Sequence, residues 1–167
     1  MSAAETSAAG SAALRRAGRG DAPGVADVLI RSRRAAAGAI PAAVHSDVEI
    51  REWIRTVVIP EREVWLAVSA DGEALAVLVL DEGWVDQLYV DPAWTGQGLG
   101  SRLIELAKSR RPAGLQLWTF TGNIRAQRFY ARHGFVVAEA TDGSGNEEKA
   151  PDIRLVWAPR QASDIRT

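Results

Sequence analysis

Hydrophobic residues along this chain recur at two different spacings, and the spacing changes from one segment to the next. A helical spacing is clearest in residues 20–36 and 46–58, where apolar side chains return every three or four positions. Asp21 is expected to cap the first of these segments, and Ser46 with Glu49 matches the capping box of the second. The pattern therefore predicts two amphipathic helices in the first part of the chain.

Shorter runs rich in β-branched and aromatic residues indicate strands. The clearest pair lies within residues 63–80, where Asp71 and Gly72 form a turn that tolerates positive φ and joins a hairpin. Two further helices are predicted, from Gly98 to about Arg110 and over residues 123–134. The remaining strands are predicted at 13–18, 83–90, 115–120, 135–140 and 153–159.

This order of elements predicts an α/β (α+β) domain in which an antiparallel meander precedes a strand–helix–strand crossover. The strand that begins at Trp84 and the strand that ends at Phe120 should form a parallel pair. A mixed sheet with helices on both faces is the architecture that buries these elements. Residues 1–12 read as a disordered tail, residues 13–158 as a single domain and residues 159–167 as a C-terminal tail.

Composition narrows the class of function. The 167 residues carry 20 Lys and Arg against 21 Asp and Glu, a balance that argues against a nucleic-acid partner. There is no Cys and there are only two His, so thiolate chemistry is excluded and no metal site is expected. No apolar run approaches the roughly 20 residues that cross a bilayer, and the first residues do not resemble a signal peptide. We therefore expect a cytoplasmic protein without a membrane partner.

The segment VDPAWTGQGLGSRL, residues 90–103, places three glycines where a strand gives way to a helix. The first turn of a helix has unpaired N–H groups and a positive dipole end, and Gly96, Gly98 and Gly100 leave room for a close approach. These features predict a site for a phosphate or pyrophosphate. A tight connection with no ligand explains the glycines equally well. The spacing fits neither a Walker loop nor a dinucleotide-binding fingerprint.

Two linked segments resemble the signatures of the GCN5-related N-acetyltransferases, the GNAT superfamily. LYVDPAWTGQGLGSRLIELA resembles the acetyl-CoA motif of that family, and NIRAQRFYARHGF resembles its second signature. The resemblance covers roughly residues 13–158 and is most specific over 84–135. It implies the GNAT fold, with a central sheet of six to seven strands whose parallel pair splays around acetyl-CoA.

The resemblance also implies which residues hold acetyl-CoA as co-substrate, with no metal. One departure is Thr95, which stands where the family usually has Arg or Gln. This puts the affinity for acetyl-CoA in question, but not the membership of the family. Arg102 or Arg125 could meet the 3′-phosphate, or could simply be solvated. The implied cofactor-binding residues are Leu88, Tyr89, Val90, Thr95, Gly96, Gln97, Gly98, Leu99, Gly100, Ser101, Asn123, Ala126, Phe129 and Tyr130.

Asn123, Ala126, Gln127 and Tyr130 share one helix face because they lie at i, i+3, i+4 and i+7. Such a polar face is not typical of a core stripe. The family pattern implies that Tyr130 is the general acid for the leaving thiolate and that Asn123 contacts pantetheine. A structural tyrosine anchored by one hydrogen bond is the alternative.

The base that accepts the proton of the ammonium is less marked. Asp86 is an acid within an apolar run, and alternation places it on the strand face of Leu88 and Val90. Partial burial would raise its pKa and suit it to proton abstraction, while a satisfied structural carboxylate is an equal alternative. His45 is a second candidate, although a histidine beside a helix cap is more often a surface residue.

The acceptor is predicted to be a primary amine on a small cationic molecule. Asp142, Glu147, Glu148 and Asp152 form an acidic loop that could border the acceptor, or could be a solvated hairpin loop. His45, Trp84 and Glu147 are candidate substrate residues, with core packing as the alternative for Trp84. Other functions left open are a silent acyl-CoA-binding module and an acetyltransferase acting on protein N-termini or lysines. A homodimer is also possible.

Overall fold

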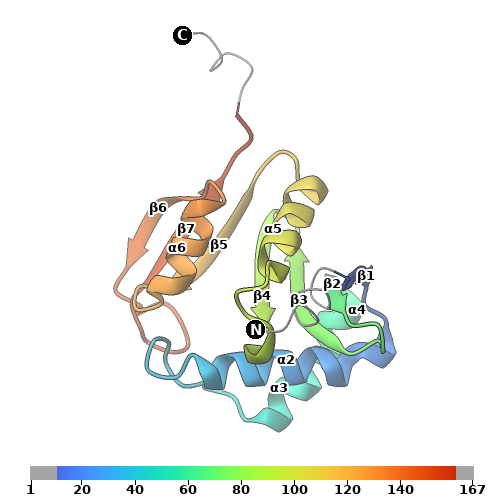
Figure 1. The fold of residues 1–167 in the computed structure, drawn as a ribbon. Coiled ribbons are helices and arrows are strands. Elements are labelled where there is room, and N and C mark those ends of the chain that lie inside the picture. Colours follow the sequence, from blue (N-terminus) through green and yellow to red (C-terminus); the bar gives the residue numbers. More distant parts are fainter. Residues whose placement is uncertain (1–10, 161–167) are drawn as a thin grey trace.

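A computed structural model describes residues 11–160 of the chain. Within that range seven strands form one sheet in the order β1-β2-β3-β4-β5-β7-β6 (Figure 1). The first four strands are antiparallel neighbours, β4 and β5 are parallel, and β5, β7 and β6 are antiparallel again. The predicted mixed sheet, with its meander followed by a parallel pair, is confirmed. The strands are β1 (Ala13–Arg16), β2 (Glu63–Val68), β3 (Ala74–Asp81), β4 (Trp84–Val90), β5 (Leu115–Phe120), β6 (Val136–Thr141) and β7 (Asp152–Trp157).

The helices begin and end close to the positions that the sequence indicates. Ser46 and Glu49 form the predicted capping box, since the Glu49 N–H donates to Ser46 Oγ and the Ser46 N–H donates to Glu49 Oε2. Asp21 precedes α2 but makes no capping bond, because its carboxylate accepts from Arg15 and from the Gly18 N–H instead. The helices are α2 (Ala22–Ala35), α3 (Asp47–Trp53), the π-helix η2 (Ile54–Val58), α4 (Ile59–Glu61), α5 (Leu99–Arg110) and α6 (Ile124–Arg132), with short 3-10 turns η1 (Arg19–Asp21) and η3 (Pro92–Trp94).

Two hydrophobic clusters lie on the two faces of the sheet. α2, α3 and η2 cover one face of β2 and β3, where Val28 of α2 and Ile54 of η2 join Leu66 of β2 in one cluster. α5 and α6 cover the other face, where Leu103 and Tyr130 join side chains of β3, β5 and β7. Burial of these two apolar faces is the main force that holds the helices on the sheet.

The parallel pair opens into a gap soon after it begins. Trp84 and Gln116 are the single pair of residues in register between β4 and β5 within the described range, and the Gln116 N–H donates to the Gly83 carbonyl at 3.0 Å. Beyond this point the two strands diverge, as Figure 1 shows. The peptide groups along the open edge of β4 therefore have no partner strand on that side.

A β-bulge shifts the faces of β4. Val85 pairs with Leu80 and Gln87 pairs with Val79, so Asp86 is the extra residue. Asp86 pairs with Arg62, which stacks over Trp53 in the α2–α3 cluster, whereas Leu88 and Val90 pack in the α5–α6 cluster. The prediction that Asp86 shares a face with Leu88 and Val90 is therefore wrong.

The predicted tails fall mostly outside the described residues, and the domain limits stay a prediction. Residues 1–10 and 161–167 lie beyond the described range. Ala12, assigned to the N-terminal tail, is 3% exposed and packs in the α5–α6 cluster. The packed part of the chain therefore begins at least one residue earlier than expected.

Candidate active site

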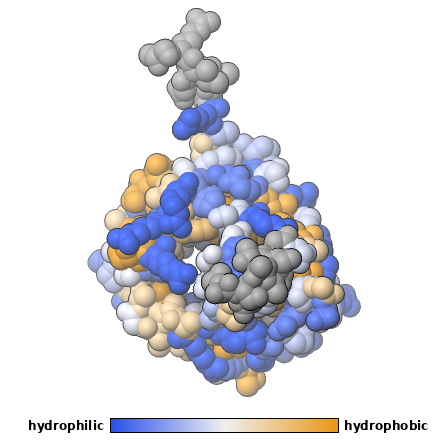
Figure 2. All heavy atoms as spheres, in the orientation of Figure 1, coloured by the Kyte–Doolittle hydropathy of each residue, from blue (hydrophilic) through white to orange (hydrophobic). Residues whose placement is uncertain are grey.

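A cleft of about 1470 Å³ occupies the gap between the diverging strands. The molecule is visibly hollowed here, and hydrophilic side chains gather over α6 beside the hollow (Figure 2). The cleft is also lined by the last turn of α2, the start of α5 and the β6–β7 loop. With α6, which also lines it, six separate parts of the chain converge on this space.

The glycine loop at one end of the cleft adopts the backbone that its sequence demands. Gly96 and Gly98 have φ of +75° and +86°, and a Cβ atom at either would meet nothing within 4 Å. Asp91 stabilises the start of the loop, because its buried carboxylate accepts hydrogen bonds from the Ala93 N–H and from the Arg31 guanidinium. The open side of both glycines leaves the loop accessible to a ligand.

α5 begins at this loop and directs its first turn into the cleft. Its first N–H groups have no acceptor within the helix, and the dipole makes this end positive. α5 and α6 lie close together at Gly100, where a Cβ atom would stand 3.4 Å from the Phe129 ring, at van der Waals contact. Ser101 Oγ lies 3.0 Å from Nε2 of His133, whose Nδ1 lies 3.3 Å from Glu105 Oε1. The start of α5 is thus held by His133, the residue that follows α6.

The polar face of α6 is partly structural. Asn123 caps the helix, since its Oδ1 accepts from the Ala126 N–H at 3.2 Å, and this leaves its amide N–H groups for a ligand. Gln127 Nε2 donates to the carbonyls of Thr121 and Phe120 and so fixes the turn before the helix. The sequence signature therefore mixes residues that can bind with residues that shape the turn.

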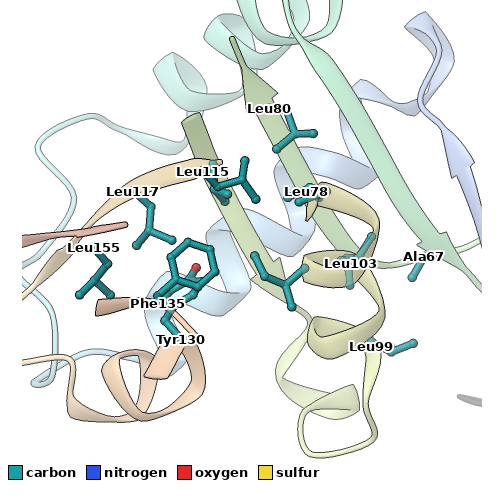
Figure 3. Packing of buried hydrophobic residues seen from close by; sticks show 14 of the residues in the cluster. Ala67, Leu78, Leu80, Leu99, Leu103, Leu115, Leu117, Tyr130, Phe135 and Leu155 are labelled. Carbon is teal, nitrogen blue, oxygen red and sulfur yellow. The ribbon is translucent and has the colours of Figure 1, made fainter. Parts of the chain in front are cut away.

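Tyr130 lines the cleft and is 8% exposed. Its ring packs edge-on against Phe129 and Phe135 in the α5–α6 cluster (Figure 3). Burial, with a smaller contribution from nearby Tyr89, raises the pKa of the Tyr130 phenol. The hydroxyl therefore stays protonated throughout the physiological range.

Asp86 lines the cleft from the bulge and forms an ion pair with Arg62, whose guanidinium stacks over Trp53. Burial raises the pKa of Asp86, although the Arg62 guanidinium opposes the shift. The pKa thus lies above the usual range of an aspartate despite the positive partner.

Most of the site residues predicted from the sequence line this cleft, but four do not. Gln97 and Trp84 are not among its lining residues. His45 and Glu147, both proposed as substrate residues, lie outside the lining and contact each other at 3.1 Å across 102 positions of sequence. This contact joins the α2–α3 connection to the β6–β7 loop beside the cleft.

Several residues that line the cleft were not predicted from the sequence. Arg128 and Arg132 line the cleft with Arg125, whereas Arg102 is not among the residues that line it. The spacing i, i+3, i+7 along α6 could have revealed this row. Arg33, from α2, also lines the cleft, and no short motif in the sequence marks it.

Residues 11–160 contain no helix that is both long and apolar enough to span a membrane. In the same range, no three His, Asp or Glu side chains come together in a way that could hold a metal ion.

The fold and the cleft define an acyltransferase of the GNAT type. A family model for the acetyltransferase (GNAT) domain matches residues 60–137. A curated relative from Salmonella typhimurium, named peptidyl-lysine N-acetyltransferase YjaB, is 30% identical over 99 residues, which cover 59% of this chain and 68% of the relative. The chain therefore belongs to the GNAT acetyltransferases, a family that uses acetyl-CoA.

Other similar proteins agree with this assignment. An uncharacterized N-acetyltransferase from Archaeoglobus fulgidus is 26% identical and matches 80% of this chain and 99% of its own length. Apo YjaB from Escherichia coli shares the fold with a TM-score of 0.72 at 24% identity, over 89% of this chain and 98% of that one. PaiA N-acetyltransferase from Thermoplasma acidophilum, solved in complex with coenzyme A, gives a TM-score of 0.66 at 21% identity over 89% and 99%.

Proposed function

We propose that this protein transfers an acetyl group from acetyl-CoA directly to a primary amine of a small molecule. The observation that carries the proposal is the gap between β4 and β5, which runs from the glycine loop to Tyr130. Peptide groups of Leu88, Tyr89 and Val90 border this gap and can bond the pantetheine arm and the acyl carbonyl. A preorganised N–H at that carbonyl contributes about 3 kcal/mol in the transition state.

The residues of the loop fit a pyrophosphate. Gly96 and Gly98 have open space where a side chain would stand, and Leu99, Gly100 and Ser101, whose N–H groups belong to the first turn of α5, line the cleft beside them. The Thr95 hydroxyl donates to the Pro92 carbonyl and so closes the loop. Backbone donors, rather than the missing Arg or Gln, would therefore hold the phosphates.

The proton transfers are assigned to two side chains. Tyr130, kept neutral by burial, would donate to the leaving thiolate. Asp86, whose pKa is raised by burial, would accept a proton from the amine directly or through water. Asn123 would orient pantetheine with its free amide N–H groups.

The acceptor amine would arrive as a cationic ammonium, which the carboxylates of the β6–β7 loop would attract. Several acidic residues of the loop already have partners, because Asp152 accepts from Thr141 and Asn146, and Glu147 contacts His45. Charge at the rim is thus a weaker source of selection than the lining of the cleft. The His45–Glu147 contact beside the cleft supports a small acceptor over a bulky one. A cytoplasmic location and a homodimer stay predictions.

A protein lysine is the second candidate acceptor. Two relatives, from Salmonella typhimurium and Escherichia coli, are named peptidyl-lysine N-acetyltransferases. A lysine side chain is itself a primary amine on a flexible stem, so the same catalytic residues would serve.

The test combines calorimetry with acetyl-CoA and a thiol-release screen of small amines and lysine peptides. The chain has no Cys, so a thiol reagent would report released CoA without a protein background. Release with small amines at higher kcat/KM than with peptides is the expected result. Binding without release on any amine would instead indicate a silent acyl-CoA-binding module. Absence of binding would overturn the proposal.

A further inference from the structure

The guanidinium of Arg33 lies in the cleft, and two of its three nitrogen atoms make no hydrogen bond within the described residues. The side chain extends from the last turn of α2, is 18% exposed and lines the cleft. Its Nε and Nη2 atoms are buried, and among residues 11–160 neither has a hydrogen-bond partner. A buried charged group with unpaired donors is costly for the folded protein, and a bound anion would remove that cost.

The two unpaired atoms lie on the same edge of the planar group. Nε and Nη2 of a guanidinium point their N–H bonds in parallel, which is the spacing of the two oxygens of a carboxylate. Glu148 provides the nearest carboxylate, with Oε1 3.8 Å from Nη2, too far for a hydrogen bond. Glu148 belongs to the β6–β7 loop, and the following residue, Lys149, has a positive φ of +54°. The edge of Arg33 therefore pairs with this carboxylate through charge alone, without a hydrogen bond.

Two arginines near the cleft, Arg31 and Arg62, differ from Arg33 because each donates to a carboxylate. Arg31 donates to the buried carboxylate of Asp91, and Arg62 pairs with Asp86. Tyr89 lies beside Arg33. Burial raises the pKa of the Tyr89 phenol, and the positive charge of the Arg33 guanidinium opposes this shift. A polar wall of Arg33, Tyr89 and Glu148 thus borders the part of the cleft that also contains Asp86.

We propose that Arg33 binds a carboxylate of the acceptor, so that the preferred acceptors are amino acids or similar molecules that carry both an amine and a carboxylate. In this arrangement the acceptor carboxylate takes the place that Glu148 now approaches and accepts from Nε and Nη2 together. The proposal rests on the proposed function, because it names the substrate class of the same cleft. It also refines the expectation of a purely cationic acceptor.

The experiment compares each standard L-amino acid with its carboxamide, which keeps the amine and removes the negative charge. The wild-type enzyme should prefer the acid by about 10- to 100-fold in kcat/KM for the side chains that it accepts. Arg33→Gln should abolish that preference while retaining activity on the carboxamides. Arg33→Lys should restore part of it, because a lysine keeps the charge but lacks the fork.

Two further variants separate binding from folding. Arg34→Gln is the matched control, since Arg34 is the next residue, is 69% exposed and pairs with Asp47 away from the cleft. It should leave the acid preference unchanged. Glu148→Gln should lower KM for the acids because it removes the competing carboxylate, whereas loss of a merely structural ion pair would affect acids and carboxamides alike.

The outcomes also separate this proposal from the proposed function. Equal use of acids and carboxamides by the wild type, or an equal loss for both in Arg33→Gln, would overturn the carboxylate site and leave the acetyltransferase intact. If no amine is acetylated, saturation-transfer NMR of the same amino acids decides. Binding to the wild type and not to Arg33→Gln would support the site, and absence of binding to both would refute it.

Discussion

The carboxylate of Asp86 and the guanidinium of Arg62 form an ion pair at the β-bulge of β4, where Asp86 lines the cleft. Arg62 follows α4 and also stacks over Trp53, so the pair ties the helical face of the sheet to the cleft. The proposed base is thus held in one orientation by a residue that also influences its pKa.

If Asp86 is the base, its protonation limits the reaction at low pH. Asp86→Asn should lower kcat/KM by about 10²- to 10⁴-fold and remove the acid limb of the pH profile. Arg62→Gln should move that limb to higher pH, because Arg62 opposes the burial that raises the Asp86 pKa. Steady-state kinetics between pH 5 and pH 9 measure both effects. An unchanged acid limb in Asp86→Asn would make Asp86 a structural carboxylate.

Tyr130→Phe tests the general acid. The ring contacts with Phe129 and Phe135 do not involve the hydroxyl, so the variant should fold and bind acetyl-CoA as the wild type does. We expect kcat to fall by roughly 10²-fold or more, with a nearly constant Kd for acetyl-CoA. Calorimetry and thiol release give the two quantities. Wild-type turnover would assign the tyrosine a packing role only.

Gly98→Val tests the phosphate cradle. Both Gly98 and Gly72, in the β2–β3 turn, have positive φ and open space at the Cβ position, but only Gly98 lines the cleft. Gly98→Val and the control Gly72→Val should therefore each lower the free energy of unfolding by about 1–2 kcal/mol. Only Gly98→Val should weaken acetyl-CoA binding, by about tenfold or more because a side chain enters the space assigned to phosphate. A similar Kd for both folded variants would contradict the cradle.

The arginine row of α6 should recognise the 3′-phosphate of CoA. Replacement of Arg125, Arg128 or Arg132 by Gln should each reduce the preference for CoA over 3′-dephospho-CoA by about 2- to 5-fold, and less at high salt. Arg102→Gln should not, because Arg102 is not among the residues that line the cleft. Calorimetric titrations with the two ligands compare the variants. Loss of the preference in Arg102→Gln alone would reassign the site.

Glu63 should control stability in acid. Burial by itself would raise the pKa of Glu63, but hydrogen bonds from Trp65, Arg110 and Arg111 outweigh it and hold the pKa at about 2, below its ordinary value of 4.5. Because the folded-state pKa is depressed, the stabilisation is present above about pH 4.5 and is lost as the pH falls through about 2.

Glu63→Gln should accordingly lower the free energy of unfolding at pH 7 by about 3 kcal/mol. It should also flatten the decline in stability between pH 5 and pH 2, which urea denaturation at a series of pH values measures. Glu52→Gln is a control, because Glu52 pairs with Arg55 on the surface with 60% of its side chain exposed. An equal decline in wild type and Glu63→Gln would contradict the assignment.

Local signals in the sequence predict much of this molecule because their causes are local. The turn at Gly72, the capping box at Ser46 and the start of α5 at Gly98 each depend on backbone preferences within a few residues. The two linked signatures between residues 84 and 135 then identify the family, and through it the cleft.

Features that depend on the meeting of distant segments could not be read in this way. The bulge at Asp86 is visible only against the register of β3, since alternation alone places the residue on the other face. His45 and Glu147 were each considered for the substrate, but their mutual contact requires the folded chain. Arg33 has neighbours from β4 and from the β6–β7 loop. The sequence of α2 by itself therefore could not show that one edge of the Arg33 guanidinium lacks hydrogen-bond partners.

Within the described residues, β4 and β5 are joined at only one register pair, Trp84 with Gln116. A cofactor bound in the gap would make hydrogen bonds to both strands, and so would connect the β1–β4 part of the sheet to the β5–β7–β6 part. Amide protons along Leu88–Val90 and Leu117–Phe120 should then exchange more slowly with deuterated solvent once the cofactor is added, which turns occupancy of the cleft into rigidity of the whole sheet.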